Sequence, residues 1–360
     1  MFADRAWWIP AENEGKEKEY VWPFINKEFG LRLFYGGNQK EIQLRRISVH
    51  GSALIFIDSS IKNLGFLDDF PSRSVNIFYV SDETYSSIKV SKVLMNRATR
   101  NIYRDYPIHP PRNIRTWPVT ILHSAIRAIR VKLDPLKVLK AIFAGIVLAW
   151  KQLMIIAVSK FMLKEVKKIP LGYTGGFANE FIRFFKLEEE DSIIDFSIKN
   201  SKKIVAAKTS TIFFTGQIGK CDRQLMLLEA NRLGLNIGPI HDGFGGPPEP
   251  QLRERAIFTH FDGLRRSLFS LVPPGNYSPE SFRMLESLLL IALPLAPRSA
   301  LSNPFYLSKF GDTWRSFQSA AISGDIGKEL DYERIVLTLI GLRQEIYIVA
   351  NEVGLTSRSF

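Results

Sequence analysis

The sequence predicts an α/β protein of two domains, each built on a parallel sheet. Its 360 residues suggest two domains, at about 100–200 residues per domain. Short apolar runs that stop at small polar residues are typical of buried strands. In the second half such runs alternate with helical patterns, as they do around a parallel sheet. Hydrophobic residues make up 46% of the chain and charged residues 23%, which excludes a disordered or collagen-like protein.

Two runs of this kind lie in the first half, and acidic residues follow each of them. Ala53 to Ile57 ends at Asp58, and Val75 to Val80 is followed closely by Asp82 and Glu83. In open α/β sheets, ligands bind beyond the carboxyl ends of the strands. These acidic residues are therefore predicted to lie at a ligand-binding edge. The alternative for Asp82 is that it caps the next helix, which is expected to run from Ser87 to Tyr103.

The positive charge is concentrated in one stretch of the chain. The net charge is +12, but from Ser86 to Ile169 there are 17 Lys and Arg against three acids, a net of +14, which leaves −2 for the rest. Such a basic belt predicts an anionic partner: membrane headgroups, nucleic acid or a charged polymer. Because aromatic residues are sparse in the belt and no RNA-binding signature appears, we expect no nucleic-acid partner.

Within the belt, the 19 residues from Ala141 to Ser159 carry a single charge, Lys151. A membrane-spanning helix needs about 20 apolar residues, and a central lysine costs about 2.5–3.5 kcal/mol on insertion. Three interpretations stay open: a buried core helix, a helix or helical pair in the membrane interface, and a true span. We favour the interface, with about Arg127 to Lys168 binding through apolar burial and attraction to anionic lipid.

The second half restarts with a strand. Helix boundaries carry clear signals there, with Gly234 just after one helix and Ser278-Pro279 at the start of another. The expected elements are a strand Thr211 to Gly216, a helix Asp222 to Leu233, a strand Leu268 to Val272, a helix Pro279 to Ile291, a strand Leu293 to Ala296 and a helix Tyr332 to Val353.

The loop from Gly216 to Lys220 joins a predicted strand to a predicted helix. Two residues separate its glycines where a P-loop has four, and Cys221 follows the lysine, so it is not a P-loop. Its backbone N–H groups, with Lys220 or Arg223, could still hold a phosphate at the helix N-terminus. The alternative is a plain tight turn.

Arg283 and Glu286 are three residues apart on a predicted helix, so they share a face. A guanidinium there could clamp a diphosphate and a carboxylate could bind ribose hydroxyls; the alternative is an exposed salt bridge. The five histidines show no metal-ligand spacing, and the single cysteine excludes an intrachain disulfide and a zinc cluster. We therefore expect no metal and no cofactor, and a reducing compartment.

A specific pattern lies between Phe213 and Phe305: Pro273-Pro274-Gly275 followed by Ser278-Pro279-Glu280-Ser281-Phe282-Arg283-Met284-Leu285-Glu286. Through it, this part of the sequence resembles the catalytic domain of exostosin-type glycosyltransferases. The sequence departs from the family at Ile291-Ala292, where relatives have Gly-Cys. Weaker similarities, in family order, are Tyr79-Val80-Ser81-Asp82-Glu83, Arg104-Asp105-Tyr106, Ile169-Pro170-Leu171-Gly172-Tyr173, Phe213-Phe214-Thr215-Gly216, Leu293-Pro294-Leu295 and Asn303-Pro304-Phe305.

The resemblance implies a GT-B architecture, in which two Rossmann-like domains face each other across a cleft. It implies a metal-independent, inverting glycosyltransferase that moves a sugar from a UDP-linked donor to a glycan or lipid-linked acceptor. We expect Asp82 or Glu83 to be the catalytic base. The expected donor-binding residues are Gly216, Lys220, Arg223, Pro274, Gly275, Ser281, Arg283 and Glu286.

We expect an N-terminal acceptor-side domain over 1–176 with a basic helical insertion at about 115–163, a linker over 177–205, a C-terminal nucleotide-sugar domain over 206–331, and a final helix and tail over 332–360. The expected location is the cytoplasm, peripheral on the inner face of a membrane. The alternative function is a non-catalytic membrane or nucleic-acid adaptor on a degenerate GT-B scaffold.

Overall fold

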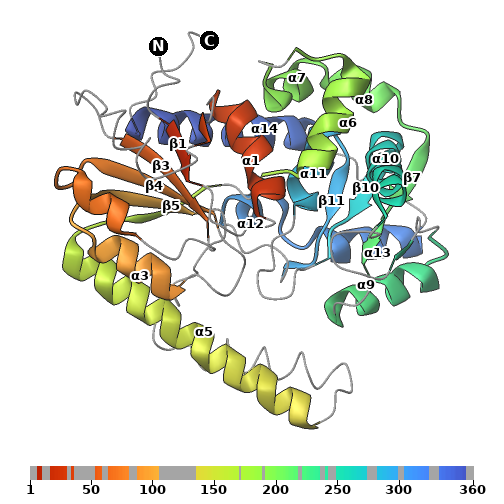
Figure 1. Ribbon diagram of the computed structural model, residues 1–360. Helices are drawn as coiled ribbons and strands as arrows, with labels where there is room; N and C mark the ends of the chain where they lie inside the picture. The colour runs from red at the N-terminus through yellow and green to blue at the C-terminus, as the bar shows by residue number, and fades with distance from the viewer. Residues whose placement is uncertain are drawn as a thin grey trace. The chain divides into compact units, whose positions relative to one another are not determined.

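The chain is an α/β protein with two parallel sheets, consistent with two Rossmann-like domains (Figure 1). It forms two compact units: Met1–Lys18, Leu31–Pro170 and Val349–Phe360 make the first, and Glu19–Gly30 and Leu171–Ile348 the second. The structure, a computed structural model, describes residues 6–9, 17–30, 34–35, 53–58, 64–80, 87–104, 135–169, 172–188, 191–217, 221–235, 240–241, 249–273, 282–298, 304–323 and 332–353.

The first unit is built on a parallel sheet with the strand order β2-β1-β3-β4-β5-β6. The predicted strands at 53–57 and 75–80 are confirmed as β3 and β4. The strands are β1 (Ala6–Ile9), β2 (Phe34–Tyr35), β3 (Ala53–Asp58), β4 (Val75–Val80), β5 (Thr99–Arg104) and β6 (Val166–Lys168).

The winding of this sheet reverses between β1 and β3. From β1 the chain moves to β2 on one side, and it returns to β3 on the other side. In open α/β sheets, ligands bind at such a reversal, in the crevice beyond the carboxyl ends of the strands. Asp58 is the last residue of β3, in register with Val80 of β4. The prediction that Asp58 lies at the carboxyl edge of the sheet is therefore confirmed, and the residue is close to the reversal of winding.

The two faces of the sheet bury different side chains, because successive residues of a strand point to opposite faces. On one face three aromatic rings lie side by side across β3, β4 and β5. The ring centroids of Phe56 and Phe78 are 4.9 Å apart, and those of Phe78 and Tyr103 are 5.1 Å apart. The other face packs against helices through Ile55, Ile57, Val75, Ile77, Tyr79 and Ile102.

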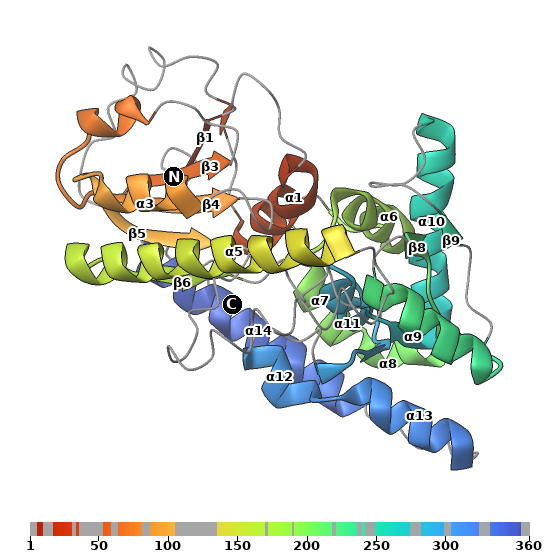
Figure 2. The same ribbon diagram turned by 90° about the horizontal axis from the view of Figure 1, so that it is seen from below.

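Two helices, α3 (Ser87–Met95) and α5 (Pro135–Met162), lie side by side along this second face (Figure 2). Ile155 of α5 belongs to the buried cluster, so the C-terminal half of α5 is part of the core. Just beyond α5, the Lys164 ammonium donates to the carbonyls of Leu94 (2.7 Å) and Asn96 (2.6 Å). A cation at a helix C-terminus complements the helix dipole and ties the two helices together.

One expectation for the basic belt is wrong, and the structure describes the apolar stretch in part. The helix expected from Ser87 to Tyr103 ends at Met95, because Asn96 turns the chain through a 2.9 Å hydrogen bond from the Ala98 backbone N–H to its side chain. The apolar stretch is one 28-residue helix whose core contact at Ile155 fits the core interpretation in part. In the described parts of the chain, no helix has the length and apolar character of a membrane span.

The second unit contains a parallel sheet of order β11-β10-β7 and a separate parallel pair, β8 with β9. The predicted strand at 211–216 is interrupted: β7 stops at Phe213, and β8 starts two residues later, at Gly216. The strands predicted near 268–272 and 293–296 are confirmed. The strands are β7 (Ser210–Phe213), β8 (Gly216–Gln217), β9 (Ile240–His241), β10 (Ser267–Leu271) and β11 (Leu293–Leu295).

Helices surround this sheet. The expected linker over 177–205 is absent, and α6, α7 and α8 occupy it. Thr174 and Ser192 cap the first two of these helices, which bury apolar residues: Phe177 and Phe181 in α6, Ile193 and Ile194 in α7. The helices are α1 (Glu17–Phe29, almost all in this unit), α6 (Gly175–Phe185), α7 (Ile193–Lys199), α8 (Ser201–Ala206), α9 (Cys221–Arg232), α10 (Pro250–Arg266), α11 (Arg283–Leu289), α12 (Pro304–Phe310), α13 (Thr313–Ser323) and α14 (Tyr332–Glu352).

Glu28, near the end of α1, is a buried carboxylate that holds the start of α7. It accepts hydrogen bonds from the Ser192 hydroxyl (2.6 Å), the Tyr173 hydroxyl (2.9 Å) and the backbone N–H of Ile193 (3.1 Å). Burial raises the pKa of Glu28, and the bond from Ser192 and the nearby Arg343 offset this only in part. The carboxyl group therefore binds a proton more readily than an exposed glutamate does.

The C-terminal ends of α10 and α11 meet at Lys208. Its ammonium donates to the carbonyls of Leu264 (3.0 Å) and Leu290 (2.5 Å). Burial, together with the charge of Arg265, lowers the pKa of Lys208 to about 7. One side chain thus binds one carbonyl at the end of each helix.

The close approach of α10 to β7 gives the first prediction. A Cβ atom at Gly263 would lie 2.1 Å from the end of the Phe213 ring, so in Gly263→Ala either the ring shifts or β7 and α10 move apart. We expect the free energy of unfolding to fall by about 1–3 kcal/mol, although alanine favours helix more than glycine does. Urea unfolding measures the loss.

The exposed change Gln251→Ala on the same helix is the control and should leave stability almost unchanged. Shortening the ring in the double variant Gly263→Ala, Phe213→Leu should recover part of the loss. Equal stability of Gly263→Ala and the wild type would show that the close contact between Gly263 and the Phe213 ring does not constrain the fold.

Candidate functional site

The candidate site lies in the second unit, beyond the carboxyl end of β7. Phe214 and Thr215 separate β7 from β8, and both residues are buried. At this break the Thr215 carbonyl accepts a side-chain hydrogen bond from Arg283. A backbone carbonyl and a guanidinium thus meet at the edge of a parallel sheet, the part of an α/β fold where ligands bind.

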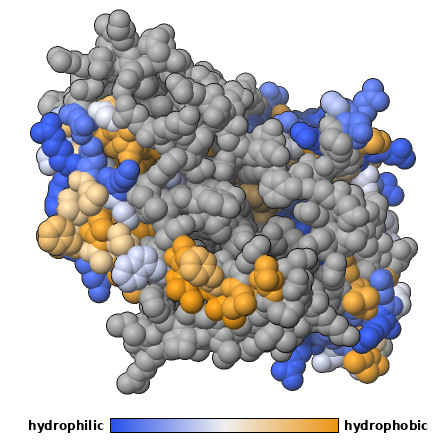
Figure 3. All heavy atoms as spheres, turned by 60° about the horizontal axis from the view of Figure 1, so that its bottom comes forward, coloured by the Kyte–Doolittle hydropathy of each residue, from blue (hydrophilic) through white to orange (hydrophobic). Residues whose placement is uncertain are grey.

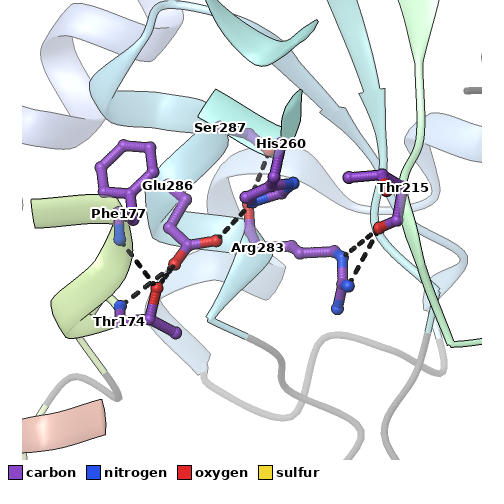
Figure 4. Close-up of polar contacts among 7 residues, drawn as sticks. All are labelled: Thr174, Phe177, Thr215, His260, Arg283, Glu286 and Ser287. Atoms are coloured by element: carbon purple, nitrogen blue, oxygen red, sulfur yellow. Dashed lines mark hydrogen bonds and ion pairs between the residues drawn. The ribbon is translucent and has the colours of Figure 1, made fainter. Parts of the chain in front are cut away.

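Arg283 is the first residue of α11, and its guanidinium is held in a fixed place. Its Nε and Nη2 atoms donate to the Thr215 carbonyl at 3.3 and 3.0 Å (Figure 4). The guanidinium carbon lies 5.5 Å from the centre of the Phe214 ring, close enough for a cation–π contact. Burial lowers the pKa of Arg283, and Glu286 opposes this, but an arginine keeps its charge in proteins. A permanent positive charge therefore lies at this edge.

Glu286, one turn further along α11, is almost fully buried and binds two other helices. Its Oε1 accepts from the backbone N–H of Thr174 (3.0 Å) and from the Thr174 hydroxyl (2.8 Å). Its Oε2 lies 2.9 Å from Nε2 of His260 on α10 (Figure 4). The carboxylate thus ties α11 to the start of α6 and to α10.

The partners of Glu286 keep it ionised. Burial alone would raise the pKa of Glu286, but the hydrogen bonds and charge of His260 and the bonds from Thr174 outweigh it, so the pKa lies below its usual range. With Glu286 ionised, Nε2 of His260 carries the proton and donates. The carboxylate faces the N-terminus of α6, where the helix dipole also favours negative charge.

Thr174 and Ser287 complete the contacts. The Thr174 hydroxyl accepts from the backbone N–H of Phe177 at 3.3 Å, so it caps α6 while it donates to Glu286. The Ser287 hydroxyl donates to the Arg283 carbonyl at 2.5 Å, within α11 (Figure 4). Each end of the short α11 segment that carries Arg283 and Glu286 is therefore fixed by hydrogen bonds.

The structure places only some of the predicted donor-site residues. Arg223 is the third residue of α9 and is buried. Gly216 is the first residue of β8. The remaining predicted residues lie outside the described residues, and their roles stay predictions: Asp82, Glu83, Lys220, Pro274, Gly275 and Ser281.

Sequence reasoning missed His260 and Thr174. His260 lies on α10, which the sequence analysis did not predict, and its contact with Glu286 joins residues 26 positions apart. The one local signal was Thr174 itself, a typical N-cap residue before the phenylalanine-rich stretch. An exposed Arg283–Glu286 salt bridge, the alternative considered for this pair, does not form among the described contacts, since each residue binds other groups.

In the described residues no group of three or more His, Cys, Asp or Glu side chains is arranged to hold a metal ion. Comparison of the chain with protein families, curated proteins and solved structures gave no match.

The buried carboxylate gives the second prediction. Glu286→Gln removes the charge that His260 and Thr174 stabilise, so the free energy of unfolding at neutral pH should fall by about 1.5–3 kcal/mol. Because the folded-state pKa lies below the ordinary value of 4.5, this contribution is complete above pH 4.5 and is lost as the pH falls through the folded-state pKa. Stability of the wild type should therefore decline more steeply on acidification than that of the variant.

Urea unfolding of both proteins from neutral pH to about pH 3 measures this difference. Glu254→Gln, an exposed change on α10, is the matched control and should follow the wild type at every pH. Parallel stability curves for wild type and Glu286→Gln would contradict a stabilising charge at Glu286.

Proposed function

We propose that the chain is a glycosyltransferase of the GT-B type, which transfers a sugar from a UDP-linked donor to a glycan or lipid-linked acceptor with inversion. The observation that carries the proposal is the guanidinium of Arg283, held at the carboxyl edge of a parallel sheet by the Thr215 carbonyl. This arginine belongs to the Ser-Pro-x-Ser-x-Arg segment through which the sequence resembles exostosin-type enzymes.

The proposed chemistry needs positive charge at this edge. Glycosyl transfer develops an oxocarbenium-like sugar and a departing diphosphate, and fixed cations stabilise the charge of the leaving group. Arg283 supplies one such cation, and Lys220 and Arg223 are proposed to supply others. The resemblance implies that transfer proceeds without a metal ion. Arginine suits the role because its planar group can bind phosphate oxygens in pairs.

Glu286 has a second possible role besides the predicted contact with ribose. Both of its oxygens are engaged in the structure, by Thr174 and by His260. A ribose hydroxyl would therefore have to replace one of these partners. The contacts favour Glu286 as a positioning residue, which fixes the helix segment that presents Arg283.

We further propose that the carboxyl edge of the sheet in the first unit binds the acceptor. That edge has the reversal of winding between β1 and β3, and it carries Asp58 and the buried Arg104. Asp82 or Glu83, just beyond the end of β4, is proposed as the base that accepts the proton of the acceptor hydroxyl.

The third prediction tests the donor site. Arg283→Ala should weaken UDP-sugar binding about 10- to 100-fold, as expected for losing about 1.5–3 kcal/mol of charge-assisted hydrogen bonding. The measurement is calorimetric titration of a UDP-sugar chosen from a thermal-shift panel. Arg315→Ala, an exposed arginine on α13, is the matched control.

A folded Arg283→Ala that binds and turns over the donor within about twofold of the wild type would refute this site. Absence of any nucleotide-sugar binding or hydrolysis by the wild type would instead favour the non-catalytic adaptor.

The fourth prediction concerns the base. If Asp82 or Glu83 accepts the proton, Asp82→Asn or Glu83→Gln should greatly reduce kcat while donor binding stays nearly constant. If Asp82 only caps the following helix, Asp82→Asn leaves kcat unchanged, and Asp82→Ala lowers stability by about 0.5–2 kcal/mol. Steady-state kinetics beside thermal unfolding of each variant separates the two roles.

A further inference from the structure

A continuous row of large apolar side chains lies exposed along α5. Each of six residues has between 42% and 68% of its surface exposed, far more than a core residue has. In Figure 3, where the underside of Figure 1 is turned forward, apolar side chains gather on this face. The row, called here the α5 stripe, consists of Leu136, Leu139, Phe143, Ile146, Trp150 and Met154.

The α5 stripe is one face of the helix. Its members are three or four residues apart, so on a helix of about 3.6 residues per turn they fall within roughly 80° of one another. Ile155 lies about a quarter-turn beyond this arc and is buried in the core of the first unit. The helix is thus fixed to its own unit by one side and shows an apolar side to the outside. Phe161, strongly exposed in the last turn of α5, continues the row, and the exposed Leu163 lies just past the end of the helix.

The charge of α5 is entirely positive. Its 28 residues include four lysines and neither Asp nor Glu. At about 100° per residue, Lys140 and Lys151 fall along one border of the α5 stripe and Lys160 along the other. The helix also belongs to the stretch from Ser86 to Ile169, whose net charge is +14.

We infer that the α5 stripe docks on the surface of an anionic lipid membrane, with the helix lying in the plane of the interface. Helices that bind this way have one apolar face and lysines at its borders, where the ammonium groups reach the headgroups while the stems stay on apolar surface. At 1.5 Å per residue, α5 offers an edge about 40 Å long for this contact. Its end beside α3, fixed by Lys164, would keep the first unit next to the bilayer.

Charge decides between a membrane and a second copy of the chain. Spacings of three and four residues also suit the seam of a coiled coil. Pairing two α5 helices would bring eight lysines together, four from each, with no acid on either helix to offset them. An anionic lipid surface instead attracts each cation by about 1 kcal/mol.

The fifth prediction tests this docking with the full-length protein. It should co-sediment with vesicles that contain phosphatidylserine at low salt, bind pure phosphatidylcholine vesicles more weakly, and bind less at high salt without complete loss. Salt screens the lysines but not the apolar contact. Phe143→Glu with Trp150→Glu should weaken binding about tenfold or more, because both side chains leave the bilayer.

The matched control places the same charges on exposed apolar residues of the second unit, Ile322→Glu with Leu337→Glu, and should bind as the wild type does. Thermal unfolding shows whether each variant stays folded. A second readout needs only a mild change: brominated lipids should quench part of the tryptophan fluorescence, and Trp150→Phe should remove that part.

Failure to bind phosphatidylserine vesicles at low salt would overturn the inference. The inference would also be overturned if Phe143→Glu with Trp150→Glu bound vesicles as tightly as the wild type, or if Trp150→Phe left the quenching unchanged. Sedimentation equilibrium tests the other occupant. If the wild type is a dimer, Phe143→Glu with Trp150→Glu is a monomer, and neither binds vesicles, then the α5 stripe is an interface between two copies of the chain. None of these outcomes depends on transferase activity.

Discussion

The second unit depends on one buried charge, the carboxylate of Glu286. It accepts from Thr174 at the start of α6 and faces His260 on α10, so three helices distant in the sequence meet at two oxygen atoms. A buried carboxylate without such partners would be costly, so the helices are constrained to meet there. One turn further along both helices, Lys208 holds α10 and α11 together through the carbonyls of Leu264 and Leu290. Arg283 gains its fixed position from this frame.

A second buried carboxylate in the same unit shows that burial alone does not set the charge. Burial raises the pKa of Glu28, and its hydroxyl partners and Arg343 do not reverse the shift. For Glu286, the facing His260 and the backbone N–H of Thr174 outweigh burial and lower the pKa of the carboxyl group. The two groups therefore respond in opposite directions to acid: protonation favours the folded state at Glu28 and disfavours it at Glu286. Glu28 can therefore be protonated without loss of stability, whereas Glu286 stabilises the fold only while it is ionised.

Local patterns predicted β3, β4, β10 and β11, because runs such as Val75 to Val80 carry their own burial signal. The residues of β5 were instead assigned to a helix. The helix α10 was missed, since its sequence is largely polar and only Phe261 and Leu264 are buried. The interpretation of 177–205 as a linker was wrong. The acidic run Glu188-Glu189-Glu190-Asp191 is typical of solvated chain, but in the sequence it separates only α6 from α7. Spacing placed Arg283 and Glu286 on one helix, but their partners come from other elements, and contacts between distant elements leave no local pattern.

The interleaving of the two units sets an order for the growing chain. Glu28 belongs to the second unit, and its backbone carbonyl accepts from Arg343, so this contact waits until nearly the whole chain has been made. Tyr103 and Lys167 of the first unit likewise wait for Glu352. When the ribosome has synthesised only the first half of the chain, the buried phenylalanines and isoleucines of β3 and β4 are already present but these contacts are not. The contacts that close both units therefore form only after the last helix has been synthesised.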